Sequence, residues 1–148
     1  MRAVVTRVRS ASVEIQGRIN GEIGKGYLIL LGVGPSDSEE AAVKLADKIC
    51  NLRIFEEENG KMNQSLEQVG GSILVVSQFT LYADTSSRRP GFTGAARADV
   101  AIPLYERFLA RCRERGFPVA HGEFGADMQV ESINDGPVTI LFDTERKE

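Results

Sequence analysis

The sequence predicts an α/β fold: a single mixed sheet system with helices packed on one side. Three patterns support this: an alternating segment at the start, two apolar runs that are each followed by a helical pattern, and three strand-like segments near the end. The predicted order is two strands, two strand–helix units and three strands. With 148 residues and no internal repeat or linker, we expect a single domain over residues 1–148.

The first two strands lie in residues 1–25. Apolar and polar residues alternate in residues 1–15, as is typical of a strand. One face carries Val4, Thr6 and Val8, and the other carries Val5, Arg7 and Arg9. The following "SVEIQGRINGEIGKG" predicts a turn at Gly17 and a second strand.

The first strand–helix unit starts with "YLILLGV", residues 27–33, whose continuous apolar character predicts a buried central strand. Ser36 and Glu39 have the spacing of a capping box. We therefore expect a helix over about 37–50. Its apolar positions are Ala42, Leu45, Ala46 and Ile49.

The second unit starts with "SILVVSQFTL", residues 72–81, after a short strand "LRIFEEE" (52–58) and a turn at Asn59-Gly60. Residues 84–97 read as a polar loop. Asp99 is the expected cap of a helix that runs to about Glu114, with Pro103 near its first turn and Gly116 and Pro118 after its end. The apolar stripe of this helix is Leu104, Tyr105, Phe108, Leu109 and Cys112. The three final strands are expected at 118–124, 127–133 and 138–143.

The composition restricts the function class. Hydrophobic residues make up 42% and charged residues 26%, values that are typical of a globular protein. No apolar run reaches the roughly 20 residues of a membrane span, and the N-terminus lacks the apolar stretch of a signal peptide. We therefore expect a cytoplasmic protein with no membrane partner. The net charge of −3 argues against a broad nucleic-acid-coating surface but permits recognition of one end of an RNA.

Few residues offer metal-binding or imidazole chemistry. Cys50 and Cys112 fall in helical patterns and are interpreted as small buried apolar residues. His121 is the one histidine, and a surface or structurally satisfied role is the commoner reading for it. These residues cannot build a zinc site unless carboxylates supply most ligands, so we expect no metal.

The segment "SQFTLYAD", residues 77–84, is the first candidate site. Ser77, Gln78 and Thr80 gather at the C-terminal end of an apolar strand, where ligand sites of sheet proteins often lie. Backbone N–H groups at such an exit could hold an oxyanion. A strand that simply reaches the surface explains the pattern equally well.

Two arginine groups are candidate RNA contacts. "SSRR", residues 86–89, offers hydroxyls and guanidinium groups that can bind phosphate oxygens, although a plain surface loop explains it too. Arg107, Arg111 and Arg115 recur every four residues along the second helix. A solvated helix face is the expected role of this second group.

"SINDGPVTILF", residues 132–142, places a Gly-Pro pair directly before an apolar run. Asn, Asp and Gly tolerate left-handed backbone, and Pro fixes φ, so a turn before a strand is the direct interpretation. A functional role for Gly136 and Pro137 stays open on this evidence alone.

Taken together, "SQFTLYAD", "RRPGF" followed by "GAA", and "NDGPVTI" resemble the D-aminoacyl-tRNA deacylase family. "ADMQV" (126–130) and the N-terminal "MRAVVTRV" fit as well, so the resemblance covers the chain. It implies the same segment order, arranged in helix, sheet and sheet layers with mixed, largely antiparallel strands. It also implies a homodimer with active sites at the interface. Each site would combine the Ser77–Thr80 strand of one subunit with Gly136 and Pro137 of the partner subunit.

The resemblance also implies residue roles. The Gly136–Pro137 peptide would be cis and would present backbone carbonyls to the substrate's α-amino group, so that an L side chain clashes whereas a D-amino acid or glycine fits. Arg7 would support that loop. Phe79 would stabilise the oxyanion through its backbone N–H, and Thr80 would position the ester. Ser77 and Gln78 would bind substrate.

The implied reaction is hydrolysis of the ester in D-aminoacyl-tRNA, and in glycine mischarged on alanine tRNA, assisted by the ribose 2′-OH and without a cofactor. Phe124 and Met128 resemble residues around the terminal adenine, although core packing explains them equally well. The alternative is a non-catalytic nucleic-acid-binding protein on this fold, which we would expect to carry a basic tail; the chain ends "DTERKE", so no DNA partner is expected. A synthetase editing domain would need a fused partner.

Overall fold

The fold is described by a computed structural model that covers residues 1–146. Its sheet is built on β1 (Arg2–Ile15), which is long enough to pair with three other strands. On one edge β1 pairs antiparallel with β3 (Gly26–Gly32) and, further along, with β2 (Arg18–Ile23). On the other edge it pairs antiparallel with β8 (Gln129–Asp143).

The sheet continues in parallel and curls toward a barrel. β6 (Ser72–Ser77) pairs with β3, and β7 (Val119–His121) pairs with β6, which gives the order β2-β1-β3-β6-β7. The outer strands β2 and β7 lie close to each other: the Asn20 side chain on β2 donates a hydrogen bond to the backbone carbonyl of His121 on β7 at 2.7 Å. A small core fills the inside of this curl: Val8, Ala11, Val13, Leu28, Leu74 and Val76.

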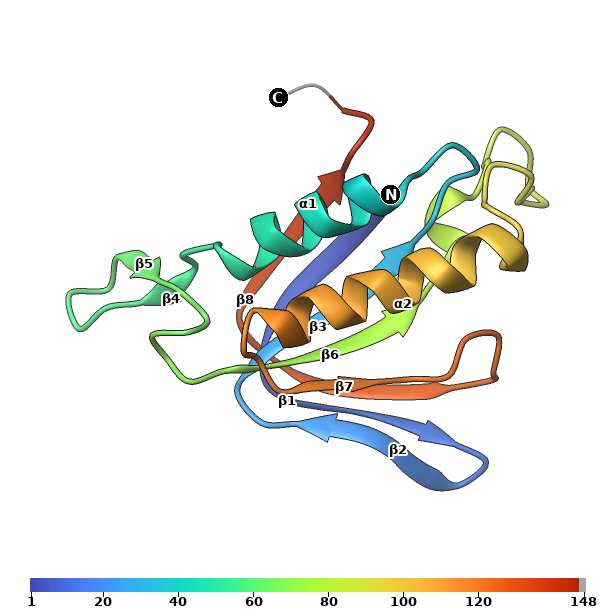
Figure 1. Ribbon diagram of the computed structural model, residues 1–148. Helices are drawn as coiled ribbons and strands as arrows, with labels where there is room; N and C mark the ends of the chain where they lie inside the picture. The colour runs from blue at the N-terminus through green and yellow to red at the C-terminus, as the bar shows by residue number, and fades with distance from the viewer. Residues whose placement is uncertain (147–148) are drawn as a thin grey trace.

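Two helices cover one face of the sheet (Figure 1). They are α1 (Glu39–Cys50) and α2 (Ala98–Glu114), and their apolar faces bury the main core against β1, β3 and β6. The predicted mixed α/β arrangement of helix and sheet layers is confirmed. No helix among residues 1–146 is long and apolar enough to cross a membrane.

Both predicted helix caps are wrong by two residues. Ser38, not Ser36, caps α1, because its side chain accepts from the Ala41 N–H at 3.2 Å. The turn before it is fixed by Asp37, which accepts from the Gly34 N–H at 2.6 Å. Arg97 occupies the cap position of α2, and Asp99 lies inside the first turn, where a carboxylate favours the positive end of the helix dipole.

Three predicted strands are longer than the observed ones, which end where their pairing with a neighbouring strand ends. The 52–58 strand is reduced to β4 (Phe55–Glu56), which pairs with β5 (Met62–Gln64) across the predicted Asn59-Gly60 turn. The 72–81 strand stops at Ser77, because the neighbouring β3 ends at Gly32, and residues 79–82 form the 3-10 helix η1 (Phe79–Tyr82). The 118–124 strand shortens to β7.

The two strands expected at 127–133 and 138–143 are one strand, β8. The predicted turn at "NDGP" is therefore wrong. Pairing with β1 passes from Val8↔Asn134 to Thr6↔Thr139, so three extra residues bulge out of β8 at this point. The Gly136–Pro137 peptide bond within this bulge is cis.

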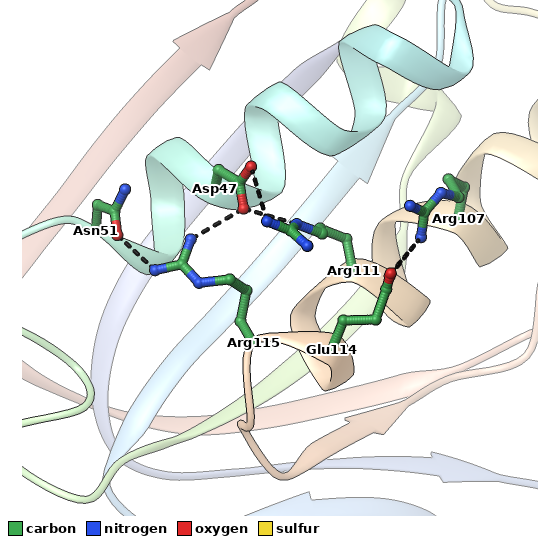
Figure 2. Close-up of polar contacts among 6 residues, drawn as sticks. All are labelled: Asp47, Asn51, Arg107, Arg111, Glu114 and Arg115. Atoms are coloured by element: carbon green, nitrogen blue, oxygen red, sulfur yellow. Dashed lines mark hydrogen bonds and ion pairs between the residues drawn. The ribbon is translucent and has the colours of Figure 1, made fainter.

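Arginines of α2 bind carboxylates instead of forming a solvated face (Figure 2). Arg111 donates to both oxygens of Asp47 on α1, at 2.8 and 3.3 Å, and Arg115 donates to the same carboxylate at 2.9 Å. The hydrogen bond from Arg111 is the main cause that lowers the Asp47 pKa. Arg107 contacts Glu114 at 2.8 Å and Glu39 at 3.2 Å. These arginines therefore tie the two helices together.

Cys50 and Cys112 are buried, as predicted. They come from α1 and α2, and both belong to the main core between the helices and the sheet.

Candidate active site

A cavity of about 260 Å³ opens at the C-terminal end of β6. Its walls come from the β6 exit and the neighbouring end of β3, from the start of α2 with Ala96 before it, and from the segment that leads from β7 into β8. Five of the residues predicted for the site lie on these walls: Ser77, Gln78, Phe79, Phe124 and Met128. The structure therefore brings together residues that are separated by about fifty positions in the sequence.

The β6 exit supplies the polar wall of the cavity. Gln78 still follows the sheet, because its backbone N–H donates to the Leu31 carbonyl at 2.8 Å. Phe79 then starts the η1 turn, and the first N–H groups of a helical turn have no partner within it. The Phe79 N–H donates to no other group of residues 1–146. A free backbone donor thus lies at the cavity wall.

The far wall is apolar and is formed by Phe124 and Met128. Phe124 packs beside Tyr105 of α2, with 6.1 Å between ring centroids. Met128 occupies space left by Gly122, where an added Cβ would collide with the methionine sulfur. Both side chains are half-buried and touch the core as well as the cavity, so core packing is confirmed for both, whereas their contact with the terminal adenine stays a prediction.

Side chains that could act as bases are absent from the cavity walls, as far as residues 1–146 define them. Tyr105 lines the cavity, but its hydroxyl donates to the Val75 carbonyl at 3.2 Å, and burial raises the pKa of Tyr105 to about 12. His121 lies on β7 outside the cavity, and its Nδ1 contacts the Gly122 carbonyl. The walls include no Asp, Glu, Lys, Arg or His of the described chain.

Thr80 lies beside the cavity and is not one of its lining residues. Its side chain is exposed, and its hydroxyl oxygen accepts a hydrogen bond from the Gln78 amide. The predicted cluster of Ser77, Gln78 and Thr80 therefore exists, with Thr80 at its outer edge.

Sequence reasoning did not assign Phe92, although its motif "RRPGF" was recognised. The Phe92 ring meets the Phe79 ring edge-on, with 5.1 Å between centroids. This contact joins the loop of residues 84–97 to the cavity mouth. Ala96, Ala101 and Tyr105 also line the cavity; the sequence placed Ala96 in the loop and Tyr105 in the apolar stripe of the helix, and it assigned no role to Ala101. The sequence signal that could have identified Phe92 was an aromatic residue in an otherwise polar loop.

Gly136 and Pro137 lie away from this cavity, beside Arg7. The buried Arg7 guanidinium donates to the Asp135 carbonyl at 3.0 Å and to the Ile54 carbonyl at 2.7 Å. A Cβ on Gly136 would lie 2.9 Å from Arg7 Nη2, and the glycine has φ +125°. A side chain at position 136 would crowd the Arg7 guanidinium and strain the backbone, so this contact favours glycine.

The bulge at residues 134–138 faces outward, since Gly136 and Pro137 are exposed. Large apolar side chains of β8 are exposed on either side: Ile133 is 58% exposed and Leu141 is 69% exposed. Phe79, at the cavity mouth, is 55% exposed. Both the cavity and the bulge therefore present apolar surface to the surroundings.

No group of three or more His, Cys, Asp or Glu side chains within residues 1–146 could hold a metal ion. Beside the bulge, the carboxylates of Glu56 and Asp135 are each 3.5 Å from the Arg7 guanidinium.

Comparison with known proteins identifies the family. The family described as D-Tyr-tRNA(Tyr) deacylase matches residues 4–143. The chain belongs to this family. It is 54% identical to a D-aminoacyl-tRNA deacylase of Symbiobacterium thermophilum, over 99% of this chain and 97% of the relative. It is 58% identical to the deacylase of Chloroflexus aurantiacus, over 97% of this chain and 91% of the relative.

Solved structures share the fold. One described as a c-Myc DNA unwinding element binding protein is 40% identical, with a TM-score of 0.91 over 97% of this chain and 98% of the other. One described as a probable eukaryotic D-amino acid tRNA deacylase is 20% identical, with a TM-score of 0.81 over 95% and 97% of the two chains. The second likeness concerns the fold alone.

Proposed function

We propose that this protein, acting as one domain over residues 1–148, hydrolyses the ester bond of D-aminoacyl-tRNA and releases free amino acid and tRNA. Glycine mischarged on alanine tRNA is the second proposed substrate. The observation that carries the proposal is the cavity that gathers Ser77, Gln78 and Phe79 against Phe124 and Met128 in a member of this family. A tRNA substrate also places the proposed activity in the cytoplasm.

The chemistry is assigned to backbone groups and to the substrate itself. The free Phe79 N–H stabilises the oxyanion that forms when water attacks the ester. The ribose 2′-OH next to the ester assists the water, because the cavity walls offer no charged side chain or histidine among residues 1–146. Ser77, Gln78 and Thr80 position the ester.

The terminal adenosine is assigned to the apolar wall. Stacking of a base on an aromatic side chain is worth about 1–3 kcal/mol and depends little on base identity. Phe124 supplies the ring, and Met128 supplies a polarisable side chain beside it. The amino acid then extends toward Phe79 at the cavity mouth.

Chiral selection is assigned to a second copy of the chain. In the proposed homodimer, Gly136 and Pro137 of the partner subunit close the cavity and accept hydrogen bonds from the α-amino group. An L side chain would then point into the backbone of this loop, whereas a D side chain or glycine would not. The outward-facing bulge, its anchoring by Arg7 and the exposed apolar residues of β8 support this arrangement.

A non-catalytic nucleic-acid-binding function is the competing proposal, since one structural relative is described as binding a DNA element. We favour the deacylase because relatives with 54% and 58% identity carry that name, against 40% for the DNA-binding relative.

The deciding experiment incubates the purified protein with matched D-tyrosyl-tRNA and L-tyrosyl-tRNA and follows ester loss. We expect rapid loss of the D form alone. Binding of tRNA without cleavage of either ester would favour the competing proposal. Loss of both esters would retain a deacylase and refute the chiral role of Gly136 and Pro137.

A further inference from the structure

We propose that residues 85–98 form a phosphate-binding surface for the tRNA backbone immediately 5′ of the terminal adenosine. The inference rests on the proposed function, since it concerns how the same substrate reaches the same cavity. It assigns a role to Arg88, Arg89 and Arg97, which neither the cavity nor the β8 bulge uses.

The charge of this segment differs from that of the chain. Residues 85–98, "TSSRRPGFTGAARA", contain three arginines and no Asp or Glu, whereas the whole chain has a net charge of −3. A local positive segment on an acidic protein attracts phosphate at one place and leaves the remaining surface unattractive to nucleic acid.

Arg88, Arg89 and Arg97 have no carboxylate partner within residues 1–146, as is also true of Arg18 and Arg113, and their position beside the cavity distinguishes them. Five arginines elsewhere form ion pairs with carboxylates: Arg2, Arg7, Arg107, Arg111 and Arg115. Arg88, Arg89 and Arg97 are also exposed. Their guanidinium groups therefore remain available, and guanidinium binds phosphate in a bidentate manner.

The segment lies at the cavity mouth. Ala96 lines the cavity and Arg97 follows it directly, while Phe92 contacts Phe79. In Figure 1 the loop projects beyond the C-terminal end of β6 and the first turn of α2, two elements whose residues line the cavity. In the proposed binding mode, a polynucleotide whose last base occupies the cavity leaves past this loop.

The loop is also shaped by its own hydrogen bonds. Asp84 and Gly91 pair through both backbone groups, at 2.8 and 2.9 Å, and close an inner loop that contains Arg88 and Arg89. Ser87 donates to the Arg89 carbonyl at 2.9 Å. These bonds hold Arg88 and Arg89 together on a short loop, further along the chain from the cavity wall than Arg97. Arg97 is thus placed for the phosphate nearest the terminal adenosine, and Arg88 and Arg89 for the preceding ones.

The test compares two double variants that remove the same charge. Arg88→Ala with Arg89→Ala alters the proposed surface. Arg18→Ala with Arg113→Ala removes two exposed arginines that also lack ion pairs in residues 1–146 and that do not line the cavity. Each protein is assayed for kcat and KM on D-tyrosyl-tRNA over a series of salt concentrations. Its affinity for uncharged tRNA is measured by fluorescence anisotropy.

We expect the loop variant to raise KM about tenfold with kcat unchanged, and to weaken binding of uncharged tRNA to a similar degree. Because each phosphate contact to a single strand contributes about 0.7 to the slope of log affinity against log salt, the slope should fall by about 1.4. The control should change KM by less than about twofold, since no phosphate contact is lost.

An unchanged KM and salt slope in the loop variant would overturn the proposal, as would an equal loss in the control. A fall in kcat alone would also overturn it, because that result would place the arginines in the chemical step. If the unmodified protein cleaves no ester while the loop variant still loses affinity for uncharged tRNA, the deacylase proposal fails and the phosphate surface stands.

Discussion

The cavity at the end of β6 and the bulge around Gly136 are built in opposite ways. The bulge is fixed by a buried guanidinium that donates to two carbonyls from distant parts of the chain. The cavity has no such anchor: its polar wall is a strand exit with a free N–H, and its other wall is apolar. The bulge is held by hydrogen bonds from a charged side chain, whereas the cavity wall leaves the Phe79 backbone donor without a partner in residues 1–146.

This difference matches the two tasks of a stereoselective deacylase. Rejecting an L side chain requires a backbone that does not yield, so rigidity is needed where the proposed clash occurs. Binding the ester requires donors that have no partner until the substrate arrives. Substitutions that change one region at a time therefore separate the need for rigidity from the need for free donors.

Removing the anchor should have the largest effect. Arg7→Ala leaves the buried Ile54 carbonyl and the partly buried Asp135 carbonyl without their donor, and a buried acceptor left unsatisfied costs about 1–3 kcal/mol. With two acceptors affected, we expect a fall of about 3 kcal/mol in the free energy of unfolding, measured by urea titration. Arg2→Ala is the matched control, because Arg2 pairs with Asp143 at 3.2 Å but its side chain is 40% exposed. Equal destabilisation by both changes would contradict the anchoring role.

Adding one methyl group to the bulge should impair selectivity more than folding. Gly136→Ala places a Cβ 2.9 Å from both Arg7 Nη2 and Val138 Cγ2, at φ +125°. Because a misplacement of about 1 Å can cost about 100-fold in rate, we expect the D-to-L ratio of kcat/KM to fall about 100-fold.

Gly60→Ala provides the control for backbone strain in the Gly136 experiment. Gly60 has φ +83° and no atom within 4 Å of an added Cβ. Gly60→Ala should therefore lower the free energy of unfolding only through backbone strain, by about 1–2 kcal/mol. The Gly60 variant should lose stability and keep its selectivity. A Gly136 variant that keeps the full D-to-L ratio would show that the bulge does not select chirality.

The two regions also differ in how far the sequence reveals them. The apolar runs, the helical stripes and the polar strand exit are local patterns, and the structure confirms each of them within a few residues. The cap of α1 was misplaced because Ser36 and Ser38 are both suitable, and the choice depends on Asp37, which binds the Gly34 N–H.

The bulge could not be derived locally. "NDGP" favours a turn, but β1 continues past it and pairs with residues on both sides, so one long strand replaces the predicted pair. Arg7 contacts residues that are 47 and 128 positions away in the sequence, and a local hydrophobic pattern cannot predict a contact over such a separation. Only the resemblance to a family supplied a role for Arg7.

Weakening the apolar wall should affect binding. Phe124→Ala removes the ring proposed to stack on the adenine, a contact worth about 1–3 kcal/mol, so KM for D-tyrosyl-tRNA should rise about tenfold. Phe117→Ala is the control, because Phe117 is a core ring that does not line the cavity. If Phe124→Ala lowers Tm as Phe117→Ala does and leaves KM unchanged, its role is core packing.

The smallest effect is expected at the outer edge of the cavity. Thr80 is exposed, lines no wall and has no base beside it; its hydroxyl accepts from the Gln78 amide. A covalent nucleophile should lose about 10⁶-fold in kcat on removal. We instead expect Thr80→Ala to lose less than about tenfold, as befits a group that only helps to orient its neighbours. Thr80→Ser, which keeps the hydroxyl, should restore most of that loss. Single-turnover assays with mass spectrometry of the quenched enzyme provide the decisive readout. An acyl-threonine adduct would move the chemistry from the free backbone donor to a side chain, and the contrast between the two regions would no longer hold.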